Sequence, residues 1–243
     1  MRKIEKFTRG GYVKYFGTDD YVMIPETITE KDQETRGVWF STVGNIDIQK
    51  MTDVDSYKES LLSVIKKVKE YHFNAVIFQV RPMNDAFYES DLNPWSKFIT
   101  GVEGQFPGFD VFGWFIEQAK KEDIEVHAWI NPYRVSGTKY TDLNMTAEEY
   151  LDSLSEKNFA RRRKDLVIET VEKKFILDPA SVEVQEFVSD SVLEIARNYD
   201  VKAVHIDDYF YPYEAIVDPL EEEKHQKQAP ELTLADFRRK NVD

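Results

Sequence analysis

The chain of 243 residues contains no cysteine, which excludes disulfides, thiol nucleophiles and thiolate metal sites. No window approaches 18 consecutive apolar residues, and the first ten residues lack the apolar run of a signal peptide. We therefore expect no membrane association and, for the sequence as it stands, a cytoplasmic location. The net charge is -13, from 45 acidic and 32 basic side chains, so nucleic acid and anionic lipid are also unexpected partners.

What the sequence does contain is a regular alternation of strand and helix patterns. Helical patterns follow Asp53 or Asp55, Asp110, Thr146 with its capping-box partner Glu149, and the pair Asp178-Pro179. The apolar runs with the length and β-branched content of strands are 38–43, 75–80, 124–130 and 201–206. Strands that alternate with helices predict a parallel sheet in an α/β protein.

The position of polar residues within these strands favours a barrel over an open nucleotide-binding sheet. An open sheet of that kind normally carries a glycine-rich phosphate turn after its first strand, and residues 43–46, VGNI, provide none. Inside a barrel, residues of one parity line the interior. Polar or aromatic residues keep that parity in three strands: Gln79 and Arg81; His127, Trp129 and Asn131; His205 and Asp207. We predict a TIM (β/α)8-type barrel with its chemistry at the carboxyl ends of the strands.

The length of the chain accommodates only part of such a barrel. Strands begin near positions 37, 75, 124 and 201, so eight units at this spacing would need about 400 residues. We expect residues 35–243 to form about the first four βα units and residues 1–34 to be an N-terminal extension with a short hairpin. Half a barrel exposes two sheet edges, which predicts a truncated protein or pairing with another chain, including self-association through the barrel edges.

Five stretches at the strand ends resemble the glycosyl hydrolase-like 10 family, formerly called DUF187. The resemblance spans roughly residues 35 to 242. The matching stretches are RGVW at 36–39 with Asn45, FQVR at 78–81 with NDAFY at 84–88, HAWINPYR at 127–134, LDP at 177–179, and HIDDYFYP at 205–212. The resemblance implies a (β/α)8 glycosidase that acts on a polysaccharide, and some relatives act on bacterial cell-wall glycan and are exported.

The chemistry of glycoside hydrolysis points to Asp207. The reaction needs two carboxyl groups roughly 5 to 9.5 Å apart. The parity of Asp207 directs it inward, so we predict that it is the nucleophile or stabilises the oxocarbenium-like transition state. Asp208 points away unless the strand bends, although the two roles can be exchanged. The second carboxyl group is left open: Asp85 and Glu214 are candidates, and it can also lie on a later strand.

The remaining predicted site residues provide donors, acceptors and flat rings for a carbohydrate substrate. Taken singly, each aromatic or histidine in such a barrel is more often a packing residue. We predict no cofactor. The predicted substrate-binding residues are Gln79, Arg81, Asp85, His127, Trp129, Asn131, Tyr133, Arg134, His205 and Tyr209.

Two other functions fit the same residues. The first is a noncatalytic carbohydrate-binding remnant of a glycosidase barrel, which would bind glycan without turnover. The second is a metal-dependent hydrolase, because His127, His205 and Asp207 are possible ligands. This alternative is disfavoured because no His-x-His or His-Glu-x-x-His motif is present, and we predict no metal site.

Overall fold

The computed structural model describes residues 1–7, 10–27 and 34–206, and every structural statement below concerns these residues. The chain divides into two compact units, which meet in the sequence at Thr35 and Arg36. Each unit is described by itself. The predicted residues Asp207, Asp208, Tyr209 and Glu214 lie outside the described part of the chain.

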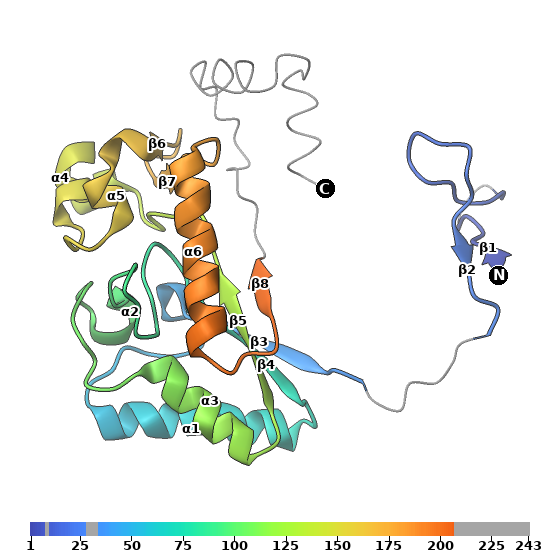
Figure 1. Ribbon diagram of the computed structural model, residues 1–243, viewed down its shortest axis with the longest axis horizontal. Coiled ribbons are helices and arrows are strands. Elements are labelled where there is room, and N and C mark those ends of the chain that lie inside the picture. The colour runs from blue at the N-terminus through green and yellow to red at the C-terminus, as the bar shows by residue number, and fades with distance from the viewer. Residues whose placement is uncertain (8–9, 28–33, 207–243) are drawn as a thin grey trace. The chain divides into compact units, whose positions relative to one another are not determined.

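A parallel sheet of four strands runs along one side of the larger unit (Figure 1). Its strands lie side by side in the order in which they occur along the chain, and every neighbouring pair is parallel. The strands are β3 (Gly37–Phe40), β4 (Ala75–Arg81), β5 (Glu125–Ile130) and β8 (Val204–Ile206). Sequential parallel strands with intervening helices form a partial (β/α) barrel, which confirms the predicted fold class.

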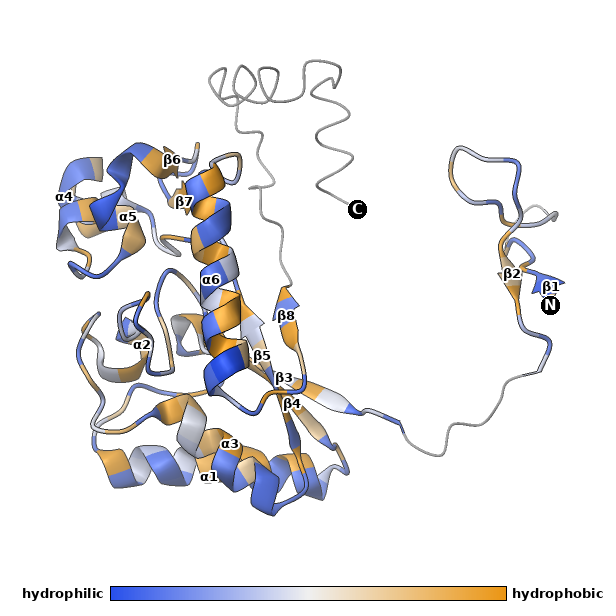
Figure 2. Ribbon diagram, in the orientation of Figure 1, coloured by the Kyte–Doolittle hydropathy of each residue, from blue (hydrophilic) through white to orange (hydrophobic). Residues whose placement is uncertain are grey.

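Each crossover between strands contains an amphipathic helix, along which apolar and polar residues alternate (Figure 2). The helix α1 connects β3 to β4, α3 connects β4 to β5, and α6 precedes β8. Their bounds are α1 (Val54–Glu70), α3 (Val111–Lys121) and α6 (Val182–Asn198). A short helix, α2 (Lys97–Thr100), lies in the loop after β4, and a 3-10 turn, η1 (Val43–Asn45), follows β3. None of the helices in the described ranges is both long and apolar enough to span a bilayer.

Among the three crossover helices, the caps confirm two of the predicted starts and correct the third. Asp53 accepts a hydrogen bond from the Ser56 amide at 2.9 Å and caps α1, and Asp110 caps α3 in the same way. The predicted start of α6 at Asp178-Pro179 is wrong, because the helix begins after Ser181. The Asp178 carboxylate instead accepts from the amide of Ala180, only two residues on, which makes a tight turn before the helix.

A long excursion separates β5 from α6 and contains short elements only. The predicted capping box is present, since Thr146 and Glu149 exchange side-chain to backbone hydrogen bonds at the start of α4. The elements are η2 (Tyr140–Leu143), α4 (Ala147–Ser153), α5 (Phe159–Arg162), η3 (Lys164–Leu166), β6 (Val167–Glu169) and β7 (Phe175–Leu177). The antiparallel pair β6 and β7 forms a sheet of its own.

Two apolar clusters hold the larger unit together. The first lies between the sheet and the helices α1 and α3, with Phe78 of β4 at its centre. The Phe78 ring meets the rings of Phe40 and Phe115 edge to face, with centroids 4.8 and 4.9 Å apart. The second cluster joins the excursion to α6, where Phe159 stacks on Phe187 at 4.3 Å. The excursion is therefore packed against α6 by an apolar core of its own.

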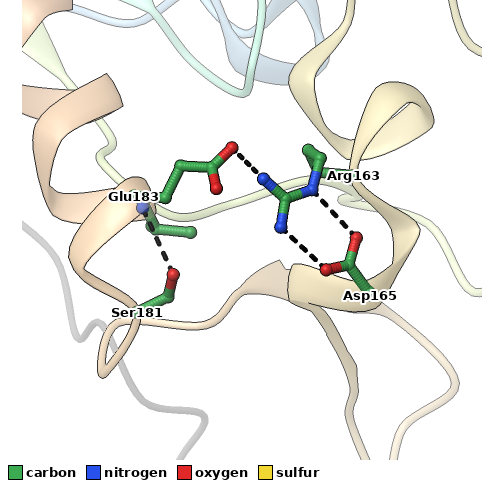
Figure 3. A network of polar contacts seen from close by, with 5 residues as sticks. Arg163, Asp165, Ser181 and Glu183 are labelled. Atoms are coloured by element: carbon green, nitrogen blue, oxygen red, sulfur yellow. Dashed lines mark hydrogen bonds and ion pairs between the residues drawn. The ribbon is translucent and has the colours of Figure 1, made fainter.

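A polar network at the surface also joins the excursion to α6 (Figure 3). The guanidinium of Arg163 donates two hydrogen bonds to the carboxylate of Asp165, at 3.0 and 2.8 Å, and forms an ion pair with Glu183 in the first turn of α6. Ser181, the N-cap, lies beside Glu183. Because solvent screens these side chains, we expect the network to add little to stability.

Candidate functional site

One face of the sheet gathers aromatic and histidine side chains, as the alternation of residues predicts. Trp129 of β5 is paired in register with His205 of β8. The Trp39 ring, from β3, meets Trp129 at 5.0 Å and His205 at 5.5 Å between centroids, both edge to face. We call the set Trp39, His127, Trp129 and His205 the aromatic-histidine face. Of these predicted residues, the structure therefore brings together His127, Trp129 and His205, with Trp39 still 47% exposed.

The two histidines of this face form a direct pair. Their rings are stacked with centroids 5.0 Å apart, and Nδ1 of His127 lies 2.7 Å from Nε2 of His205. Nε2 of His127 lies 3.8 Å from a carboxylate oxygen of Glu125. Burial, and then the proximity of His205, lower the pKa of His127. Because a single hydrogen bond between two imidazoles needs one donor and one acceptor, the pair favours holding at most one extra proton.

Gln79 is buried, and its side-chain oxygen is occupied by protein donors. Its Oε1 accepts hydrogen bonds from the Ser41 hydroxyl at 3.1 Å and from the amides of Thr42 and Val43 at 3.0 and 2.9 Å. The Thr42 hydroxyl donates to the backbone oxygen of Gln79 at 2.7 Å. Gln79 therefore fixes the start of the loop that follows β3.

The predicted common face of Gln79 and Arg81 is not kept. A register shift between these two residues leaves Gln79 opposite Trp129 but sets Arg81 opposite Ile130. Ile130 belongs to the apolar cluster that packs on the helices, and the Arg81 guanidinium lies 5.2 Å from the ring centroid of Phe187 in α6. The bulge adds one residue to β4, so the alternation that holds in the rest of the strand does not extend to Arg81.

Arg81 is fully buried and donates four hydrogen bonds. The acceptors are side-chain oxygens of Asn84 at 2.6 Å and Asn93 at 3.1 Å, and backbone oxygens of Asn131 at 2.7 Å and Pro132 at 3.2 Å. The guanidinium thus ties the loop after β4 to the loop after β5. Its surroundings are those of a positioning residue beneath the carboxyl ends of the strands.

Asp85 lies in the same loop and is also buried. Its carboxylate accepts from the Met83 amide at 3.0 Å and from the Ser96 hydroxyl at 2.5 Å. Burial raises the pKa of Asp85 despite these hydrogen bonds. Asp85 therefore braces the loop between β4 and α2.

Glu103 is a carboxyl group that the sequence pattern did not single out. It accepts from the Ser155 amide at 3.1 Å and from Nδ2 of Asn158 at 2.8 Å. Burial raises the pKa of Glu103, and the nearby charge of Asp85 raises it further. It lies in a loop between two glycines, where no periodicity marks it, so only its burial by the excursion identifies it.

The loop after β5 carries three more predicted residues. Oδ1 of Asn131 accepts from the amides of Tyr133 and Arg134, at 3.3 and 2.8 Å, which folds the loop back on itself. The backbone of Arg134 forms an antiparallel β-bridge with Ile176 of β7. Burial raises the pKa of Tyr133. Asn131, Tyr133 and Arg134 therefore lie next to each other at the carboxyl end of β5.

The metal alternative gains no support from the part of the chain that the structure describes. Within residues 1–7, 10–27 and 34–206, no group of three or more His, Asp or Glu side chains is arranged to hold a metal ion. The alternative set of His127, His205 and Asp207 depends on a residue outside these ranges.

Comparison with known proteins adds a family match and a fold match. Residues 34–243 match the family model described as Glycosyl hydrolase-like 10. The chain is 37% identical to "Glycosyl hydrolase YngK" of Bacillus subtilis (strain 168), over 88% of this chain and 41% of that protein. It is 31% identical to "Glycosyl hydrolase DigH" of Escherichia coli (strain K12), over 90% of this chain and 52% of that protein. The chain thus spans about half the length of these curated relatives.

A solved structure of similar fold is that of α-L-fucosidase isoenzyme 2 from Paenibacillus thiaminolyticus. The TM-score is 0.51 at 14% identity, over 86% of this chain and 29% of the fucosidase. At this level of identity the likeness concerns the barrel fold alone.

Proposed function

The chain belongs to the glycosyl hydrolase-like 10 family, and from this premise we propose that it hydrolyses glycosidic bonds in a polysaccharide or cell-wall-type glycan, with Asp207 as nucleophile or transition-state stabiliser. One observation carries the assignment to Asp207. The described part of β8, Val204–Ile206, pairs in parallel with β5, and Asp207 follows it directly in the sequence, on the carboxyl side of the strand. Barrel enzymes take their catalytic residues from this end of the strands.

Hydrolysis by this route needs a second carboxyl group that is protonated when the glycosidic oxygen leaves. A carboxyl group with a raised pKa suits this task, because it keeps its proton closer to neutral pH. Asp85 and Glu103 both have a pKa raised by burial. Glu103 is the less buried of the two, so we propose it as the proton donor. Asp208, next to Asp207 in the sequence, is the alternative.

The aromatic-histidine face and the loop after β5 supply the substrate contacts in this proposal. Trp39 is half exposed and offers a flat apolar surface, while the partly exposed Tyr133 and Arg134 offer polar groups at the carboxyl end of β5, where Asn131 folds their loop. Arg81 and Gln79 contribute indirectly, because their polar atoms hold the loops after β3, β4 and β5.

The test is release of reducing ends from purified bacterial cell-wall glycan, with binding to the same glycan measured in parallel. We expect Asp207→Asn to abolish release while glycan binding persists. Glu103→Gln should lower release and remove the alkaline limb of the pH profile, because a proton donor must be protonated to act. Glu59→Gln, a change on the exposed side of α1, is the matched control and should leave release unchanged. Equal activity in the wild type and Asp207→Asn would contradict the assignment.

A second candidate is a noncatalytic glycan-binding barrel, and one observation favours it: the buried carboxyl group of Asp85 and that of Glu103 both accept hydrogen bonds from protein donors. It predicts binding without any release of reducing ends by the wild-type chain. The same assay therefore separates the two candidates.

A further inference from the structure

The N-terminal unit contains an internal repeat of nine residues that the proposed hydrolase does not use. The apolar residues Ile4, Val13 and Val22 recur at this spacing, and so do Phe7 and Phe16. The backbone closes the three repeats into a ring. The Ile4 amide donates to the Val22 oxygen at 3.1 Å, Val22 donates to Val13 at 3.0 Å, and Val13 donates to Ile4 at 2.8 Å.

Around this ring, strand pairing is short and antiparallel. The strand β1 (Arg2–Lys3) pairs with β2 (Met23–Ile24), and single bridges join Glu5 to Tyr12 and Lys14 to Tyr21. Each repeat therefore contributes one short extended segment. The unit is a small β structure of three segments, and equivalent positions of the three repeats carry similar side chains.

The aromatic residues of this unit face solvent instead of forming a core. Every aromatic side chain among its described residues is exposed: Phe7 104%, Tyr12 44%, Tyr15 57%, Phe16 101% and Tyr21 37%. The most shielded side chains of the unit, Ile4, Val13, Val22 and Ile24, are only partly buried. Aromatic rings placed outward on a rigid backbone supply contact area at low cost in side-chain entropy, which is typical of binding surfaces.

Cations lie among these rings. Nζ of Lys3 is 3.8 Å from the ring centroid of Tyr21 and 5.4 Å from that of Tyr12, and the two tyrosine rings meet edge to face at 6.0 Å. Nζ of Lys14 lies 5.3 Å from Tyr21 and 2.7 Å from the carboxylate of Asp19. Ring faces next to ammonium and hydroxyl groups suit a ligand whose rings are apolar on their faces and polar at their edges.

We propose that the N-terminal unit binds a polysaccharide chain, with pyranose rings against Tyr12, Tyr15 and Tyr21 and with Lys3 at their hydroxyl or carboxylate substituents. The choice of a polysaccharide rests on the proposed function of the larger unit. It also follows from charge. Residues 1–27 carry five basic and four acidic side chains, so their surface exerts no strong attraction on nucleic acid or anionic lipid, whereas a hydroxyl-rich glycan needs none. By its attachment, the unit raises the local concentration of glycan near the barrel.

The experiment compares full-length variants in a pull-down with insoluble bacterial cell-wall glycan stripped of its peptides. We expect Tyr12→Ala with Tyr21→Ala to weaken binding by about tenfold or more, because each ring contact contributes a factor of several. Tyr12→Phe with Tyr21→Phe keeps the ring faces and should retain most of the binding. Tyr71→Ala with Phe106→Ala removes two exposed rings, with 69% and 59% of their surface accessible, from the larger unit and is the matched control.

Two further measurements on the same variants separate this proposal from the proposed function. Hydrolysis of short soluble glycan fragments should not change in the Tyr12 and Tyr21 variants. If the wild type binds glycan but hydrolyses none, only the proposed hydrolase function is contradicted. Glycan binding that is absent in the wild type, or unchanged in the alanine variant, overturns the proposal for the N-terminal unit. It is also overturned if the alanine changes alter the molar mass in solution or binding to anionic phospholipid vesicles instead of glycan binding.

Discussion

Replacing Arg81 by Met should destabilise the barrel strongly without removing a direct contact with substrate. The guanidinium is fully buried, and its four hydrogen bonds end on acceptors in the loops after β4 and β5. Met keeps most of the aliphatic stem and loses the guanidinium, including its contact with the Phe187 ring, so the change removes the polar head group. What is lost is the donor set that satisfies Asn84, Asn93, Asn131 and Pro132.

The magnitude follows from those orphaned acceptors. Removing one partner from a buried, charged hydrogen-bond network costs about 3–5 kcal/mol. For a domain of this size, each kcal/mol lowers the melting temperature by about 2–4 °C, so we expect a fall of roughly 6–20 °C. Arg81→Lys keeps the charge but replaces the planar guanidinium with a single ammonium group. Its loss of stability should lie between those of the wild type and Arg81→Met.

The assay is urea unfolding followed by tryptophan fluorescence, with Arg197→Met on the exposed side of α6 as the control. The control should stay within about 0.5 kcal/mol of the wild type. A loss of less than about 1 kcal/mol for Arg81→Met, together with a loss of glycan affinity, would refute the positioning role and restore the substrate-binding role that the sequence pattern suggests.

Three other changes test the remaining structure. The lowered pKa of His127 means that the unfolded chain takes up a proton before the folded chain as the pH falls. Stability measured by urea unfolding should therefore decrease from about pH 7 to about pH 5, and His127→Gln should reduce this slope. Asp110→Ala removes the cap of α3 and the 2.8 Å acceptor of the Tyr199 hydroxyl, and we expect a loss of about 1–2 kcal/mol in the same measurement. Leu61→Ala, at a fully buried position of α1, should cost about 2–5 kcal/mol, and a smaller cost would mean that the core beside α1 collapses around the missing side chain.

The sequence by itself determined the order and type of the main elements. Apolar runs of strand length and capped amphipathic patterns are local signals, since side-chain periodicity and the first turn of a helix depend on residues a few positions apart. The caps at Asp53, Asp110 and Thr146 and the common face of His127 and His205 therefore follow from sequence.

Tertiary structure decided how the polar residues are used. One extra residue in β4 turned Arg81 away from the face that strict alternation gives it, and a bulge leaves no periodic trace in the sequence. The oxygen of Gln79 is occupied by the loop after β3, and Glu103 acquires a raised pKa only because the excursion covers it. Hydrogen-bond partners and burial join residues that are distant in the chain, so they exist only once the sheet, the loops and the excursion have packed together.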